Sequence, residues 1–188
     1  MKAARKRWRA LQPQWESARL VFIDETGLNT KMARLYGRSL RHERCVTAVP
    51  HGHWQTSTFI AALRCDSVAA PFLIEGAVNA EVFTAYLRHV LCPELKKDDI
   101  VILDNLSTHK IASVAELIAA HGATVRYLPA YSPDLNPIEM AFAKLKAQLR
   151  QAAARSLAEL QVAVADSLAT FTRAHCQAFF RHAQYASI

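Results

Sequence analysis

The sequence has 188 residues, of which 52% are hydrophobic and 21% charged, a balance typical of one globular domain with a buried core. Only five glycines and seven prolines occur, which excludes collagen-like and low-complexity chains, and no apolar run approaches the roughly 20 residues of a membrane span. The net charge is +7, and residues 1–50 carry the whole excess, with eleven Lys or Arg against four Asp or Glu. This concentration favours a polyanionic partner, nucleic acid before membrane, although a solvated basic face would have the same composition.

The N-terminus is basic, but no apolar segment of a signal peptide follows it, because polar residues interrupt residues 12–19. The four cysteines are widely spaced and form no zinc-finger pattern, so we expect reduced thiols. Together these features predict a cytoplasmic protein.

The first half of the chain predicts a basic helix, a strand, a loop and a hairpin. In chain order they cover residues 3–16, 20–23, 28–52 and 53–75. The strand is a compact apolar run that ends at Asp24, a pattern typical of a strand buried on both faces. The loop is rich in arginine, and the hairpin consists of two β-type runs on either side of the polar residues 65–67.

The second half predicts helices that alternate with two further strands. The helices cover 79–91, 110–121, 136–153, a segment from Ser156 and one around 176–182, and the strands cover 100–103 and 125–128. Ser156 and Glu159 fit a capping box. This order indicates an α/β chain with an antiparallel part first and βαβ units after it. A helical crossover allows the strand ending at Asp104 to lie parallel to the strand ending at Asp24, so we expect the two aspartates side by side.

These two aspartates are the first chemical signal in the sequence. An aspartate after a strand often only starts a turn. On neighbouring strands, however, two carboxylates repel each other unless a cation lies between them. Oxygen ligands of this kind suit Mg²⁺ or Mn²⁺, which also bind substrate phosphates.

A third carboxylate, Glu139, has two interpretations. Asn136, Pro137 and Glu139 fit the N-cap, N1 and N3 positions of a helix, and this pattern alone favours a capping role for Glu139. The same helix carries Lys146 and Arg150 beside its apolar stripe, so an acid at its start could also reach a metal-bound phosphate.

Three motifs carry a resemblance to a known family. They are Phe22-Ile23-Asp24-Glu25-Thr26, then Val101-Ile102-Leu103-Asp104-Asn105 with His109-Lys110, then Leu128-Pro129-Ala130-Tyr131-Ser132-Pro133-Asp134-Leu135-Asn136-Pro137-Ile138-Glu139. They resemble the catalytic core of insertion-sequence transposases, above all the bacterial IS630 branch of the Tc1/mariner superfamily. The 34 residues between Asp104 and Glu139 are similar to the spacing of this group, and the resemblance covers roughly residues 18–185.

The resemblance implies an RNase H-like α/β fold, a mixed five-stranded sheet flanked by helices. It implies a DNA transposase, a metal-dependent polynucleotidyl transferase that performs cut-and-paste transposition at TA targets. The implied catalytic and metal-binding residues are Asp24, Asp104 and Glu139, which would hold two divalent metal ions, Mg²⁺ or Mn²⁺. Asn105 and His109 would support the metal site or contact DNA; His109 could equally be a surface residue at a helix start.

Six basic residues are expected to contact DNA phosphates, because five follow the first catalytic strand and one lies along the helix of Glu139. They are Lys31, Arg34, Arg38, Arg41, Arg44 and Lys146.

The expected partners are transposon ends and target DNA, bound by a homodimer in the bacterial nucleoid, and no membrane. No helix-turn-helix pattern precedes Asp24, so we expect a split reading frame or a truncation, with a separate helix-turn-helix polypeptide as a further partner.

The predicted division of the chain is a basic linker-like segment (1–17), the catalytic core (18–155) and C-terminal helices packed on it (156–188). The alternative is a catalytically silent or truncated transposase remnant that acts only as a DNA-binding protein. A nuclease unrelated to transposition would share the metal site but join no strands.

Overall fold

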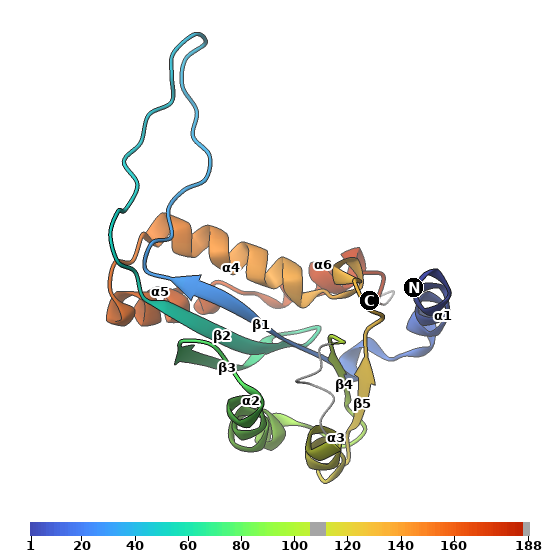
Figure 1. Ribbon diagram of the computed structural model, residues 1–188. Helices are drawn as coiled ribbons and strands as arrows, with labels where there is room; N and C mark the ends of the chain where they lie inside the picture. The colour runs from blue at the N-terminus through green and yellow to red at the C-terminus, as the bar shows by residue number, and fades with distance from the viewer. Residues whose placement is uncertain (106–111, 186–188) are drawn as a thin grey trace.

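The computed structural model describes residues 1–105 and 112–185 and has a five-stranded mixed sheet at its centre (Figure 1). The strands are β1 (Leu20–Asn29), β2 (Thr56–Leu63), β3 (Val68–Glu75), β4 (Ile100–Leu103) and β5 (Thr124–Tyr127). Their spatial order is β3-β2-β1-β4-β5. The β1–β2 and β2–β3 pairs are antiparallel, whereas β1–β4 and β4–β5 are parallel. The predicted mixed α/β sheet is therefore confirmed.

The central strand β1 is longer than the sequence predicts. The predicted strand end at Asp24 is wrong, because the turn-like residues after it continue to pair with β2 as far as Asn29. In the parallel pair with β4, Phe22 lies opposite Ile102. Two residues further along the same register, Asp24 in β1 corresponds to Asp104, which directly follows β4. The expected side-by-side placement of the two aspartates thus comes from the strand register, with only one of them at a strand end.

Helices cover both faces of the sheet, and each face has its own hydrophobic cluster (Figure 1). One face is covered by α4 (Ile138–Ala152), α5 (Leu157–Ala169) and α6 (Arg173–His182), and the other by α2 (Ala80–Tyr86) and α3 (Ala112–Ala119). Along β1, Leu20 and Phe22 face the first cluster, whereas Val21 and Ile23 face the second. Burial on both faces explains why residues 20–23 of this strand are an uninterrupted apolar run.

The helices lie close to their predicted ranges. The segment predicted over 79–91 is α2 followed by a π-helical turn over Leu87–Leu91. Ser156 caps α5 as expected, since its Oγ accepts a 3.2 Å hydrogen bond from the Glu159 N–H. The predicted capping box is nevertheless incomplete, because the Glu159 carboxylate accepts its hydrogen bond from the Arg155 N–H and not from the Ser156 N–H. The predicted start of α3 at Lys110 lies outside the described residues. Among the described helices, none has both the length and the hydrophobicity to cross a membrane.

The N-terminal helix α1 (Lys2–Leu11) packs on the end of the chain and on the loop before α4. Trp8 is buried, and its Nε1 donates a 2.6 Å hydrogen bond to the hydroxyl of Tyr185. The guanidinium of Arg5 donates two hydrogen bonds, of 2.8 and 2.6 Å, to the two carboxylate oxygens of Asp134. Part of the basic charge of the N-terminus is therefore paired within the molecule.

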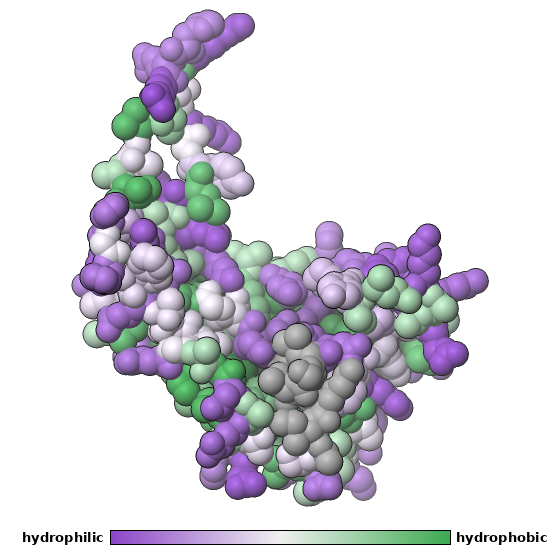
Figure 2. Space-filling view, viewed as in Figure 1, coloured by the Kyte–Doolittle hydropathy of each residue, from purple (hydrophilic) through white to green (hydrophobic). Residues whose placement is uncertain are grey.

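Residues 30–55, between β1 and β2, form a long loop that projects away from the body of the molecule (Figure 1). Figure 2 shows that its far end consists of hydrophilic residues, with hydrophobic ones nearer the body. At its base, Arg155 donates hydrogen bonds to the carbonyl oxygens of Thr30 (3.3 Å) and Met32 (2.9 Å). The predicted arginine-rich loop is confirmed, but it begins after Asn29 rather than at residue 28.

Candidate functional site: an acidic pocket beside a basic pocket

Three carboxylates from three elements line one pocket of about 390 Å³. Asp24 comes from β1, Asp104 from the residue after β4, and Glu139 from the first turn of α4. Residues 128–133, Asn105 and Asn136 complete its wall, and we call it the acidic pocket. The structure therefore brings together the three acidic residues that the sequence selected.

Asp24 is held in place from two sides. It is only 8% exposed, and its Oδ1 accepts a 2.9 Å hydrogen bond from the backbone N–H of Glu25. Its Oδ2 accepts a 2.8 Å hydrogen bond from the side-chain amide of Asn136. Each carboxylate oxygen has a second lone pair, so both can still bind a cation.

Burial and charge repulsion raise the pKa of Asp24 to about 7. Burial is the largest cause, because it removes water from around the ionised form. The hydrogen bond from Glu25 acts in the opposite direction, and the negative charges of Glu139 and Asp104 raise the pKa further. Carboxyl groups with a pKa perturbed in this way are frequent at functional sites.

The predicted capping box at the start of α4 is wrong. The side chain of Asn136 makes no cap hydrogen bond, because it is buried (4% exposed) and reaches across to Asp24 instead. The N–H of Glu139 bonds to the backbone carbonyl of Asn136 at 3.2 Å, and the carboxylate of Glu139 lines the acidic pocket. The side-chain oxygen Oδ1 of Asn136 is buried without a hydrogen-bond partner.

Asn136 is thus a site residue that the sequence interpretation missed. The Asn-Pro pair before a helix is an ordinary N-terminal signal, and nothing local shows that its side chain crosses to another element. The only available hint was its position within a motif that ends in an acidic residue.

The donor set of the acidic pocket fits a hard divalent cation. Carboxylate oxygens are the ligands that Mg²⁺ and Mn²⁺ prefer, and a buried amide oxygen without a partner can accept a hydrogen bond from a bound water. In residues 1–105 and 112–185, no three His, Cys, Asp or Glu side chains lie close enough together to form a ready-made metal cluster. The three carboxylates therefore surround an open space rather than meet at one point.

The two residues expected beside the second aspartate have different outcomes. Asn105 is exposed and lines the acidic pocket next to Asp104. His109 lies outside the described residues.

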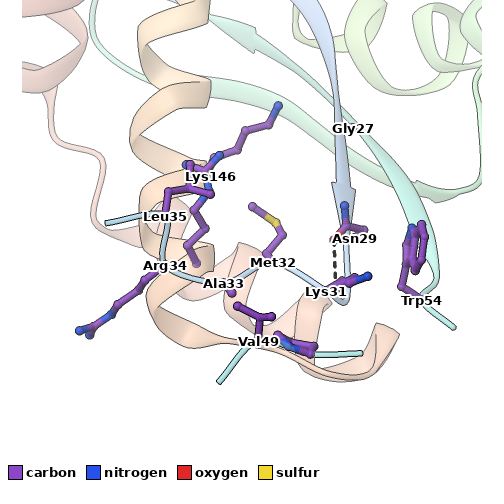
Figure 3. A pocket seen from close by; sticks show the side chains of 12 residues that line it. Gly27, Asn29, Lys31, Met32, Ala33, Arg34, Leu35, Val49, Trp54 and Lys146 are labelled. Atoms are coloured by element: carbon purple, nitrogen blue, oxygen red, sulfur yellow. Dashed lines mark hydrogen bonds between the residues drawn. The ribbon is translucent and has the colours of Figure 1, made fainter. Parts of the chain in front are cut away.

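A second pocket, of about 530 Å³, lies at the base of the long loop against α4, and we call it the basic pocket (Figure 3). Its lining includes Lys31, Arg34, Lys146 and Arg150. The Lys31 ammonium lies 4.4 Å from the ring centre of Trp54, a cation–π distance. Burial, with a smaller contribution from Arg150, lowers the pKa of Lys146. This pocket concentrates positive charge about two helical turns along α4 from Glu139.

Of the six predicted DNA-contacting residues, the basic pocket gathers three. The other three, Arg38, Arg41 and Arg44, are exposed along the outer part of the long loop and do not line it.

Solved structures with a similar fold are transposases. The Mos1 transposase paired-end complex with left transposon end has a TM-score of 0.73 at 18% identity, covering 96% of this chain and 56% of that one. A pre-cleavage Mos1 transpososome has a TM-score of 0.74 at 15% identity, covering 98% and 58%. The catalytic domain of Mos1 mariner transposase has a TM-score of 0.66 at 14% identity, covering 98% and 87%. The chain thus has the RNase H-like fold of these catalytic domains and spans a little over half of the longer transposase chains.

At the level of sequence, a search of curated proteins finds no match. The sequence model of one family, described as DDE superfamily endonuclease, matches residues 19–161, about three quarters of the chain. Because this match runs from the start of β1 to beyond the end of α4 and contains all three carboxylates of the acidic pocket, the chain belongs to the DDE superfamily endonuclease family.

Proposed function

We propose that this chain is the catalytic domain of an IS630-type transposase of the Tc1/mariner superfamily. It cuts DNA and joins strands in cut-and-paste transposition, at TA target sites. The observation that carries the proposal is the convergence of Asp24, Asp104 and Glu139 in one pocket of a DDE superfamily endonuclease. Mos1 complexes of similar fold contain a transposon end, which supports DNA as the substrate.

The acidic pocket would hold two divalent metal ions, Mg²⁺ or Mn²⁺. Asp24, Asp104 and Glu139 would hold these ions, and Asn136 would keep the Asp24 carboxylate oriented. Mos1 paired-end complexes with Mn and with Mg support this choice of metal. Such ions, when bound, activate an attacking water or 3′-hydroxyl and stabilise the leaving oxygen of a phosphodiester.

The DNA backbone would run from the acidic pocket over the basic pocket and onto the long loop. Lys31, Arg34 and Lys146 lie in the basic pocket, where they can bind phosphates close to the scissile one. The exposed arginines of the loop, Arg38, Arg41 and Arg44, would extend this contact. Asn105 and His109 would contact DNA or support the metal ligands.

The remaining parts of the proposal concern assembly. The catalytic core (18–155) would carry the basic segment 1–17 and the C-terminal helices 156–188. A homodimer would bind the two transposon ends in the bacterial nucleoid, with a separate helix-turn-helix polypeptide recognising the end sequence.

The test is metal-dependent nicking of supercoiled plasmid, followed by a strand-joining assay with a labelled donor oligonucleotide. Wild-type protein should nick with Mn²⁺, Asp24→Ala should not, and Asp166→Ala should behave as wild type because Asp166 is an exposed residue of α5. Nicking without joining would indicate a nuclease unrelated to transposition. DNA binding without nicking would indicate a silent remnant.

A further inference from the structure

Tyr131, at the rim of the acidic pocket, combines a strained backbone with an exposed ring. Its φ is +54°, in the left-handed region that bulky L-residues rarely adopt, and the residue is 87% exposed. Ala153 has a similar φ of +51°, but it is the C-cap of α4, where the left-handed conformation is usual. Tyr131 has no such role, because it lies in the loop between β5 and α4.

Contacts from its neighbours hold Tyr131 in this conformation. Arg5 donates hydrogen bonds to the carbonyl oxygen of Tyr131 (3.4 Å) and to Oγ of Ser132 (2.9 Å). Arg5 is itself fixed by Asp134, and the Ser132 hydroxyl donates to the carbonyl oxygen of Ala130 at 3.3 Å. The surroundings therefore stabilise a backbone conformation that leaves an aromatic ring in solvent. Backbone strain that is not offset by burial of the side chain is typical of functional positions.

We propose that Tyr131 stacks on an unpaired nucleobase next to the phosphate that enters the acidic pocket. This inference rests on the proposed function, because it takes DNA as the substrate. A phosphate among the three carboxylates brings the adjoining nucleotides to the pocket rim, which Tyr131 lines. Bases inside a duplex are already stacked on each other, so an exposed ring gains most from a base that has lost its partner. Stacking is tolerant of sequence, since every base presents a π-face.

The experiment compares two fluorescein-labelled probes, a short duplex with a single-stranded 3′ tail and the same duplex with blunt ends. Binding is measured by anisotropy in Ca²⁺, and a gel verifies that the probes stay intact. Wild type should prefer the tailed probe. Tyr131→Ala should weaken binding of the tailed probe about tenfold, equivalent to about 1.4 kcal/mol, and leave blunt-end binding within about twofold. Tyr131→Phe should stay close to wild type on both probes, because it keeps the ring.

Tyr131→Gly is a matched variant that removes the ring and also relieves the backbone strain. It should lose tailed-probe affinity as Tyr131→Ala does, while its Tm rises above that of Tyr131→Ala. This rise shows that the loss of affinity does not come from unfolding.

Three results would overturn the inference. If Tyr131→Phe loses as much affinity as Tyr131→Ala, the hydroxyl rather than the ring face makes the contact. If both probes lose affinity equally, or if neither loses any, the ring does not stack on an unpaired base. A wild-type protein that binds neither probe would instead refute DNA as the substrate, and the proposed function together with the inference.

Discussion

Replacing Asn136 by alanine separates two roles for this residue, a helix cap and a partner of Asp24. A cap contributes about 1 kcal/mol to stability and has no direct effect on a metal site. The structure shows the second role, because the side-chain amide bonds to the Asp24 carboxylate and makes no cap hydrogen bond. If Asn136 is a cap, its replacement should lower stability and leave metal affinity unchanged. If it is a partner of Asp24, the replacement should lower metal affinity and change stability little.

The magnitudes follow from the two polar atoms of the Asn136 side chain. Loss of its hydrogen bond to a charged group costs about 1.5–3 kcal/mol, whereas removal of its buried unpartnered Oδ1 recovers about 1–3 kcal/mol. The free energy of unfolding should therefore change by no more than about 1–2 kcal/mol, with a Tm shift of a few degrees. Metal affinity should fall about 10- to 100-fold, as is usual when a hydrogen-bond partner of a metal ligand is removed.

The assay pairs thermal unfolding without metal with Mn²⁺ titration followed by electron paramagnetic resonance. Ser156→Ala is the matched control, because Ser156 is an N-cap of the same chain outside the acidic pocket. This control should lose about 1 kcal/mol of stability and bind Mn²⁺ as wild type does. If Asn136→Ala behaves like Ser156→Ala in both measurements, Asn136 is only a cap and the reasoning fails.

Three further predictions concern charge. Because the pKa of Asp24 is raised in the folded state, the metal-free protein should lose stability as the pH rises from about 4 to about 7, by at most about 4 kcal/mol. Urea unfolding across this range should show the free energy of unfolding falling with pH for wild type but not for Asp24→Asn. Glu139→Gln should change stability by less than about 1 kcal/mol, since Glu139 lies exposed in the first turn of α4, yet abolish plasmid nicking; near wild-type nicking would remove it from the catalytic set. Replacing Arg38 and Arg41 together by Ala should flatten the slope of log K against log salt by about one to two units in a DNA-binding titration, and an unchanged slope would make the loop a merely solvated surface.

The parts of the fold that the sequence predicts are those set by periodicity and by strand order. The apolar run before Asp24 and the run before Asp104 are both buried strands, and their parallel register brings the two carboxylates to the same pocket. The predicted strand end failed because residues 25–29 resemble a turn in composition, while their pairing with β2 depends on a segment far along the chain.

The parts of the site that local patterns could not predict depend on tertiary contacts. The residues next to Asn136 are typical of an N-cap. Its side-chain amide instead donates a hydrogen bond to Asp24, which lies 112 positions away in the sequence. Local patterns also give no sign of the left-handed conformation of Tyr131, whose carbonyl oxygen accepts a hydrogen bond from Arg5 of the N-terminal helix. Local patterns thus singled out Asp24 and Asp104, whereas only the family resemblance placed Glu139 with them, and both missed the role of Asn136.

The long loop between β1 and β2 also has a consequence for how tolerant the protein is of changes in length. The two ends of the loop continue into β1 and β2, which pair with each other in the sheet. This pairing, which includes Asp24, fixes the distance between the two loop ends whatever the loop contains. The entropy of closing a flexible loop grows only logarithmically with length, and doubling it costs about 0.6 kcal/mol. A peptide tag or a fluorescent label inserted at the tip, around residues 40–43, should therefore leave the acidic pocket intact and allow the protein to be immobilised or detected.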